Sequence, residues 1–378
     1  MKKLNIFKSS LDYYHKFTRD SSSRVNIINK NKSLLVDVAG LFNFICFVIV
    51  ARKSQRININ FLSGDDKSNY IDLCKTSSDF NSELANIYIT TSSGGKHSEQ
   101  DCYVTYSSIY LMVYLVLPFS LLISFFYAIG EYKYAKEFGF IHSIKRFAIF
   151  LSKNFIYGSL YKICKTETIH LVDSYSTNQA ANYSAKKKKI KTIEIQHGIV
   201  SKGHLGYNRT NLNVNFYPCK VLLLADVFIK YLDILQLPNI EYEVTKLNYF
   251  SRLKLINTDE TDLWLVIGQP SLSNELIQLY KRLVSLGLNV KYKAHPREVI
   301  SSSFEMNYYS SSKLVKNVTY IGGFSTLLLE LFASGCKNVI AITDFVPSLY
   351  DEVLEDFGLK LESLESITKM LNEDKNEL

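Results

Sequence analysis

The stretch TIHLVDSYSTNQAANYSAKKKKIKTIEIQHG, residues 168–198, decides the fold. A strand-like run ends in the polar segment DSYS, a helical pattern follows, and a second strand-like run ends in Gln196-His197-Gly198. Strands that alternate with helical patterns favour a parallel sheet built from βα units. We therefore expect an α/β fold.

The C-terminal third repeats this alternation, and weaker signals precede it. Its strand-like runs lie at 264–270, 289–296, 317–323 and 338–343, with helical patterns at 274–287 and 325–335. Earlier strand-like runs occur at 33–38, 58–64, 86–92 and 220–226, with helical patterns at 142–163 and after 226, and residues 65–85 look loop-like. We predict a GT-B-like architecture of two Rossmann-like domains whose parallel sheets face a cleft. The predicted parts are an N-terminal acceptor-binding domain at 1–240, a linker at 241–260 and a C-terminal nucleotide-sugar-binding domain at 261–378.

Composition narrows the class of protein. The 378 residues are 47% hydrophobic and 21% charged, which is typical of a folded chain. The net charge of +8 fits an anionic small substrate or an acidic membrane surface as well as nucleic acid. The six cysteines show neither zinc spacing nor a disulfide framework, which favours a reducing compartment. The basic N-terminus has no apolar run behind it, so we do not expect a signal peptide.

Residues 103–130 form an apolar segment without a single charged residue. Its length approaches that of a membrane span, Pro118 lies in its middle, and tyrosines lie near both ends. Two interpretations stay open. One is a core helix broken at Pro118, and the other is contact with a membrane, along the surface in preference to a full span.

Polar or glycine-rich segments follow the predicted strands. Ligands bind at the carboxyl ends of strands in open parallel sheets, so these segments are the candidate site. They are DSYS (173–176), QHG (196–198), GQPS (268–271), KAHPRE (293–298) and GGFST (322–326).

Two of these segments suit a phosphate group. In GGFST, Gly322 and Gly323 permit close backbone approach, and Ser325 and Thr326 open a helix whose free N–H groups attract anions. An ordinary strand–helix turn with a serine cap is the alternative.

In KAHPRE, Lys293, His295 and Arg297 place three potential cations on one loop, where they would stabilise a leaving phosphate. A capping histidine before a proline turn is the alternative. We place Gln269 of GQPS on the same donor side.

A general base is expected in the QHG segment. His197 leaves a strand and precedes a glycine, and an imidazole near neutral pKa suits proton abstraction from a hydroxyl. On the acceptor side we place His204, Tyr207, Ser174 and Gln196. A structural histidine at His197 and a surface loop residue at His204 are the alternatives. The sequence has no Asp-x-Asp motif, and we expect no metal site.

The order of these motifs resembles a known family. QHG with a following His-Leu-Gly-Tyr segment, then Lys-x-His-Pro, then Gly-Gly-x-Ser-Thr, resembles the bacterial surface-polysaccharide glycosyltransferases of GT-B fold that make capsule and O-antigen. These enzymes are related to the bacterial sialyltransferases and the CDP-glycerol glycerophosphotransferases. The resemblance covers roughly residues 168–345.

The resemblance implies roles for several residues. His197 matches the catalytic base of the glycerophosphotransferases, His295 matches a histidine that contacts the donor phosphate, and Ser325 and Thr326 match a phosphate-binding pair. The sialyltransferases carry an acidic motif where this chain has Gln196-His197-Gly198, which argues against sialic acid transfer.

The resemblance also implies a reaction. It is an inverting, metal-independent transfer without a cofactor, from a nucleotide-activated sugar to a lipid-linked glycan acceptor. The enzyme would be cytoplasmic and peripheral to the inner membrane, with no nucleic acid partner. A CDP-glycerol-type glycerophosphotransferase or a sialyltransferase, and a non-catalytic subunit of a polysaccharide assembly complex, remain as alternatives.

Overall fold

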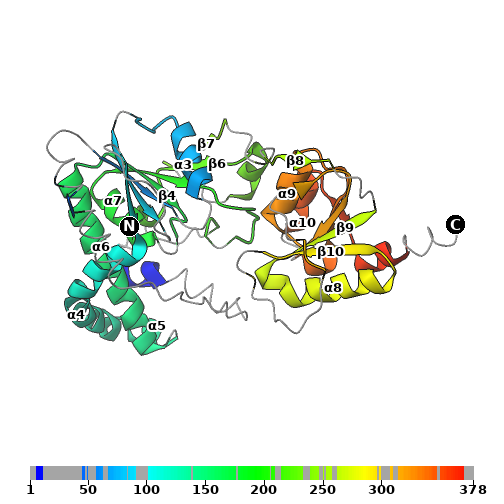
Figure 1. Ribbon diagram of the computed structural model, residues 1–378. Helices are drawn as coiled ribbons and strands as arrows, with labels where there is room; N and C mark the ends of the chain where they lie inside the picture. Colours follow the sequence, from blue (N-terminus) through cyan, green and yellow to red (C-terminus); the bar gives the residue numbers. More distant parts are fainter. Residues whose placement is uncertain are drawn as a thin grey trace.

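Two α/β halves follow one another along the chain (Figure 1). The computed structural model describes residues 6–11, 45–46, 49, 57–62, 67–82, 84–90, 101–137, 139–175, 178–204, 206–208, 214–232, 239–246, 250, 253–257, 262–295, 298, 307–309, 314–346 and 350–369. The run predicted as a strand at 33–38 lies outside these residues, and so does Arg297.

The N-terminal half is built on a parallel sheet. Within the described residues its order is β3-β2-β1-β4-β5-β6-β7, and every neighbouring pair is parallel. Almost every residue of β1, β2, β4, β5 and β6 is buried, which is expected where helices cover both faces of a sheet. The strands are β1 (Ile57–Phe61), β2 (Ala85–Thr90), β3 (Asp101–Thr105), β4 (Thr168–Val172), β5 (Lys191–Ile195), β6 (Lys220–Leu223) and β7 (Glu241–Val244).

Three expectations for this half need correction. Helix α3 (Lys67–Thr76) lies in the stretch that looked like a loop. A 3₁₀ helix, η2 (Asp226–Tyr231), follows β6 in place of an α-helix. Strand β7 pairs with β6 inside the segment predicted as a linker, so that segment begins as part of the first sheet. The amine of Lys220 on β6 forms an ion pair with Glu243 on β7, which helps to hold the two strands together.

The C-terminal half repeats the parallel arrangement. Its sheet has the order β10-β9-β12-β13-β14, and a small parallel pair joins β8 to β11. The apolar faces of α8 and α9 cover this sheet. The elements are β8 (Leu255–Ile256), β9 (Leu263–Ile267), α8 (Ser273–Ser285), β10 (Asn289–Lys293), β11 (Leu314–Val315), β12 (Thr319–Gly322), α9 (Thr326–Ala333), β13 (Val339–Ile342), α10 (Asp351–Asp356) and β14 (Lys360–Glu362). The two sheets confirm the predicted α/β, GT-B-like architecture.

Four helices complete the N-terminal half. They are α4 (Tyr106–Gly130), α5 (Tyr132–Glu137), α6 (Phe140–Cys164) and α7 (Gln179–Lys187). Helix α7 packs on β5, α6 packs on α7, and α4 packs on α6, which places α4 at the outside (Figure 1). Helix α4 runs unbroken through Pro118, and only 22% of its most apolar window is buried. The interpretation of 103–130 as a broken core helix is therefore wrong.

The two halves touch through charged and aromatic side chains. Lys202 bonds Glu352 at 2.8 Å, Tyr231 donates a hydrogen bond to Asp356, and the rings of Phe228 and Phe357 lie 5.4 Å apart. Helix α10 thus packs against η2 of the other half.

Candidate functional site

The candidate motifs lie where the strand order reverses. In the first sheet the order reverses between β1 and β4, and the DSYS and QHG segments leave β4 and β5. In the second it reverses between β9 and β12, and these strands lead into GQPS and GGFST. Such a reversal opens a crevice at the carboxyl ends of the strands, which is where doubly wound sheets bind ligands.

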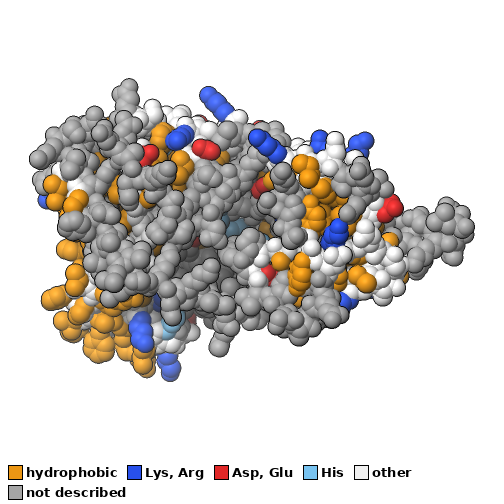
Figure 2. All heavy atoms as spheres, viewed as in Figure 1, with side chains coloured by type: hydrophobic (Ala, Val, Ile, Leu, Met, Phe, Trp, Pro, Cys, Tyr) orange, Lys and Arg blue, Asp and Glu red, His pale blue; other side chains and the backbone are white. Residues whose placement is uncertain are grey.

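The two crevices face each other at Gly198 and Thr326. Gly198 has a φ of +83°, which favours glycine, and a β-carbon built on it would lie 3.5 Å from Oγ1 of Thr326. The segment after β5 therefore meets the N-terminus of α9 across the two halves. Figure 2 shows a hollow between the halves, with histidine surface at its base.

His197 lies half-buried beside this contact. Its Nε2 is 3.0 Å from the hydroxyl of Tyr175, and the two rings stack with centroids 5.8 Å apart. Among the described residues, no group hydrogen-bonds its buried Nδ1. Burial lowers the pKa of His197 below its ordinary value, and the charge of Asp173 opposes this shift. Burial therefore favours the neutral imidazole, in which one ring nitrogen carries a lone pair.

Asp173 and Tyr175 are site residues that the sequence analysis did not single out. Asp173 has a φ of +69°, which is uncommon for a residue other than glycine and occurs at functional sites. The hydroxyl of Tyr175 reaches His197 directly. Both belong to DSYS, the polar segment that follows β4. Because β4 lies next to β5, the strand that precedes His197, the position of DSYS was the signal in the sequence that could have identified them.

The predicted acceptor-side residues shape the loops and offer little surface. Ser174, Gln196 and Tyr207 are buried. The Ser174 hydroxyl bonds Glu194, and Gln196 donates to the Gly198 carbonyl at 2.9 Å. These buried side chains pack and hydrogen-bond beneath the surface, where they fix the position of His197 and its loop.

His204 is nearer the surface than these three residues. It is half-buried, and its Nδ1 accepts a hydrogen bond from the backbone of Gly206 at 3.2 Å. Its ring lies 6.5 Å from that of His197 and 5.5 Å from that of Tyr175. His204 thus belongs to the aromatic cluster around the candidate base.

Glu298 organises the KAHPRE loop, and the sequence analysis missed this role. Its carboxylate accepts hydrogen bonds from the Tyr292 hydroxyl at 2.6 Å, the Ser273 hydroxyl at 2.5 Å and the backbone N–H of His295 at 2.9 Å. A β-carbon at Gly268 would collide with this carboxylate. The loop is therefore fixed against the start of GQPS, and His295 leaves β10 at a defined position.

The remaining donor-side residues converge at the reversal between β9 and β12. A β-carbon at Gly323 would lie 3.2 Å from Oε1 of Gln269, and among the described residues that oxygen has no hydrogen-bond partner. Gly322 packs closely against the backbone of β9. Gly323 is tightly enclosed, since a β-carbon there would also lie 2.5 Å from Cδ1 of Leu272, whereas a β-carbon at Gly322 would make only ordinary contacts.

The N-terminus of α9 is where the sequence predicts a phosphate to bind. Ser325 caps the helix, because its hydroxyl accepts from the N–H of Leu327 at 3.2 Å. The serine cap that the alternative interpretation of GGFST expected is thus present, and Thr326 is the hydroxyl that faces the other half. Lys293 lies with its amine 5.5 Å from the Tyr309 ring centre. Within the part of the chain that the structure describes, no three His, Cys, Asp or Glu side chains are grouped to hold a metal ion.

Comparisons with known proteins give distant structural neighbours. No protein-family model matches the chain, and no curated protein matches it in sequence. Structures similar to it include UDP-N-acetylglucosamine 2-epimerase from Rickettsia bellii, at 12% identity and a TM-score of 0.39 over 81% of this chain and 78% of that one. The UDP-GlcNAc 2-epimerase of Methanocaldococcus jannaschii has 10% identity and a TM-score of 0.43 over 84% and 93%.

The third neighbour is a Streptomyces sp. SF2575 glycosyltransferase, SsfS6, complexed with thymidine diphosphate. It has 9% identity and a TM-score of 0.40 over 80% of this chain and 85% of that one. At these identities and TM-scores the neighbours carry no inference about the reaction. The interpretation of the site rests on the chain's own residues.

Proposed function

We propose that this chain is an inverting, metal-independent glycosyltransferase that uses a nucleotide-activated sugar. The observation that carries the proposal is the approach of Gly198 to Thr326, at 3.5 Å from the Gly198 β-carbon position to Oγ1. This approach puts the candidate base, His197, next to a helix N-terminus that suits a phosphate. A base and an anion site on opposite walls of one crevice are the two groups that sugar transfer requires.

The donor would occupy the reversal between β9 and β12. Backbone N–H groups around Gly323 and the start of α9 would bind the diphosphate, with Thr326 as an additional donor. His295 would supply a further contact from the loop that Glu298 fixes. These groups favour the charge that develops on the leaving diphosphate more than they favour the intact donor.

His197 would act as the base. In the tautomer whose Nε2–H donates to the Tyr175 oxygen, Nδ1 holds the lone pair. Because Nδ1 is buried, the loop must shift before this nitrogen takes the proton from an acceptor hydroxyl. The freed oxygen forms a bond to the anomeric carbon while the bond from that carbon to the diphosphate breaks. The nucleoside diphosphate leaves with the electron pair, and the configuration at the anomeric carbon inverts. The acceptor would be a growing surface glycan on a lipid carrier at the cytoplasmic face of the inner membrane.

The proposal is tested by nucleotide release from a panel of nucleotide sugars, with bacterial lipid extract as acceptor. His197→Ala should lower the rate by about 10²-fold or more, which is the usual contribution of a general base, and leave nucleotide affinity within twofold. Lys337→Ala, at an exposed lysine of the C-terminal half, is the control and should retain full activity. Equal release by wild type and His197→Ala would refute the proposed base.

Two other outcomes bear on the alternatives. Turnover of a CDP-alcohol in place of the nucleotide sugars would identify a glycerophosphotransferase and overturn sugar transfer. No turnover, together with normal glycan assembly in cells that carry His197→Ala, would identify a non-catalytic subunit.

A further inference from the structure

Helix α4 has its polar and apolar sides reversed relative to a helix in water. From Tyr114 to its end, its buried residues are Ser120, Ser124 and Ala128. The large apolar side chains point outward, with exposed fractions of 78% at Leu115, 73% at Phe119 and 64% at Phe126. Large contiguous apolar patches are uncommon on soluble monomers and mark interaction sites, so this row of exposed apolar side chains indicates a partner.

The buried seam is small and polar. The Ser152 hydroxyl on α6 donates to Oγ of Ser120 at 2.8 Å, and Ser124 donates to the Ser120 carbonyl at 2.6 Å. Small residues four apart let two helices approach closely, and hydroxyl bonds join them, as in helix pairs that lie in lipid. A polar seam of small residues beneath an apolar outer surface is typical of helix pairs whose outer surface contacts lipid.

The apolar surface continues from α4 onto α6. Ile141, Phe155 and Ile163 are exposed on α6, and their spacing places them on one face of that helix. Figure 2 shows the resulting hydrophobic surface along one side of the molecule, beside lysine and arginine side chains. Exposed tyrosines and phenylalanines are as numerous on it as leucines and isoleucines. Aromatic side chains favour the boundary between headgroups and acyl chains.

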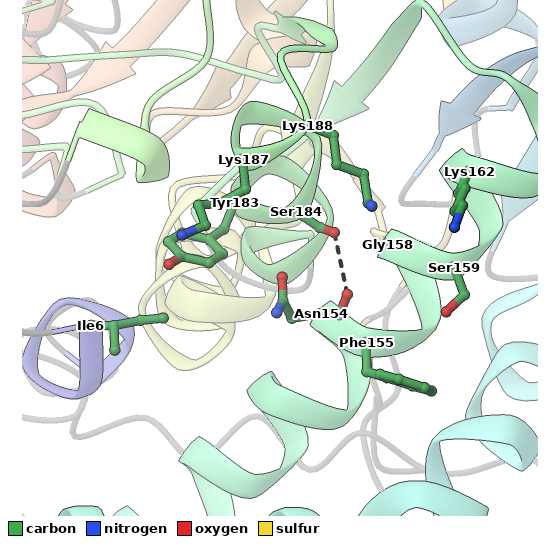
Figure 3. Close-up of a pocket in the computed structure, with 10 residues that line it drawn as sticks. All are labelled: Ile6, Asn154, Phe155, Gly158, Ser159, Lys162, Tyr183, Ser184, Lys187 and Lys188. Carbon is green, nitrogen blue, oxygen red and sulfur yellow. Dashed lines mark hydrogen bonds between the residues drawn. The ribbon is translucent and has the colours of Figure 1, made fainter.

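Basic residues lie along the same side. Lys145 and Arg146 are exposed on α6. A groove of about 560 Å³ between α6 and α7 is lined by Lys162, Lys187 and Lys188 and by the exposed ring of Phe155 (Figure 3). Lysine amines beside an apolar surface complement the phosphates of an anionic bilayer.

The first turns of α4 are anchored in the protein, and this limits how much of the helix can enter a bilayer. Its first turns are fixed in the protein, because the Tyr106 hydroxyl donates to Asn178 at 2.8 Å and Thr105 caps the helix. The free apolar part, 114–130, is then ~25 Å long, which is shorter than a bilayer core. Helix α5 follows with Lys133, Lys136 and Glu137, which would be costly to bury in lipid.

We propose that the α4–α6 face, defined by the outer surfaces of these helices and the adjacent lysine groove, docks in the plane of an anionic lipid bilayer. This proposal does not depend on the proposed reaction. Docking here would hold the crevice near a membrane, where a lipid-linked substrate is found.

Flotation of the purified full chain with vesicles tests the docking. Vesicles of phosphatidylcholine alone are compared with vesicles that also contain phosphatidylglycerol. The wild type should float with both and more strongly with the anionic vesicles. The triple variant Leu115→Gln, Phe119→Gln, Phe126→Gln should bind at least about tenfold more weakly, because it removes the apolar contact. A matched control, Val214→Gln, Tyr242→Gln, Val284→Gln, changes exposed apolar residues elsewhere and should float like the wild type.

The lysine groove is tested separately. Lys162→Gln, Lys187→Gln, Lys188→Gln should lower affinity for anionic vesicles by up to about fivefold per lysine and leave binding to neutral vesicles unchanged. Lys254→Gln, Lys316→Gln, Lys337→Gln, at exposed lysines of the other half, should have no such effect.

Three results would overturn the proposal. They are an apolar triple variant that floats like wild type, a dimer that forms without lipid and is lost in that variant, and a protein released from vesicles only by detergent. The second would assign the face to another copy of the chain, and the third would indicate a span.

Discussion

The hydroxyl of Tyr175 lies 3.0 Å from Nε2 of His197. Tyr175 leaves β4 and His197 leaves the neighbouring β5, so the parallel pairing of these strands brings the two side chains together. The bond occupies one imidazole nitrogen and orients the ring. In the proposed mechanism the other nitrogen, Nδ1, takes the substrate proton after the loop shifts to expose it. An orienting partner of this kind is a recurring feature of catalytic bases.

Removing this bond should impair catalysis more than binding. In Tyr175→Phe the ring remains while the hydrogen bond is lost, which is worth about 0.5–1.5 kcal/mol. We expect kcat/KM to fall by about 2–10-fold with nucleotide affinity unchanged. Steady-state nucleotide release measures this change. A variant whose nucleotide affinity falls in parallel with its rate would show that Tyr175 acts on the donor site instead.

The pH profile should report the pKa of His197. Burial lowers this pKa, so the neutral, basic form persists to lower pH than for an ordinary histidine. The acid limb of kcat/KM should therefore lie below pH 6.5, with activity lost as the pH falls further. Because the Asp173 charge raises the pKa, Asp173→Asn should move this limb to still lower pH. An acid limb that moves upward in Asp173→Asn would contradict the assignment.

Gly206 makes room for Tyr175. A β-carbon at this position would overlap the tyrosine ring, so Gly206→Ala must displace the ring or the loop. We expect a loss of about 1–3 kcal/mol in unfolding free energy, together with a lower kcat. Chemical denaturation and nucleotide release measure the two effects. Gly130→Ala is the control, since a β-carbon there meets nothing within 4 Å.

A charged network secures β7 to the first sheet. The Lys220 amine bonds Asp79 at 2.9 Å and also bonds Glu243. Burial alone would raise the pKa of each carboxyl, but hydrogen bonds from lysines and Ser78 outweigh it and lower both. Lys220→Met should cost about 1–2 kcal/mol, less than a fully buried pair, because the carboxylates regain some water.

The same network sets a dependence on acid. Because the carboxyl pKa values are lower in the folded state, their contribution is present above about pH 4–5 and is lost as the pH falls through their folded values. Denaturation of wild type and Lys220→Met as a function of pH measures this, and the difference between them should shrink in acid. A difference that stays constant from neutral pH to acid would rule out the ionic contribution.

The sequence predicted those strands whose hydrophobic pattern is clear. Strands β4, β5, β9 and β12 are short apolar runs followed by polar or glycine segments, and these signals located both crevices. Helix α3 was missed because its residues are polar and its packing comes from distant strands. Strand β7 was missed for a related reason, since it has only four residues, two of them glutamates, and Lys220 on β6 links it through an ion pair to Glu243.

The sequence predicted where the candidate site lies in the fold better than it predicted what each of its side chains contacts. The closing segments gave His197 and Thr326, but the pairing of Tyr175 with His197 depends on side chains from two strands. Glu298 could not be recognised because its partners are Ser273 at the start of α8, Tyr292 on β10 and the backbone of His295 in the loop after β10. Ser174, Gln196 and Tyr207 are polar residues that point inward, and sequence alone does not give the direction of a loop side chain.

The most direct test of the central claim is a thermal-shift screen against UDP, GDP, CDP, CMP and dTDP. The wild type should gain Tm with one of these nucleotides, and the gain should be lost in His295→Ala and Gln269→Ala, which keep the fold but lose crevice contacts. His197→Ala should retain the gain, because the base does not hold the nucleotide. A folded wild type whose Tm none of these nucleotides raises would contradict a nucleotide-sugar enzyme with its donor site between β9 and β12.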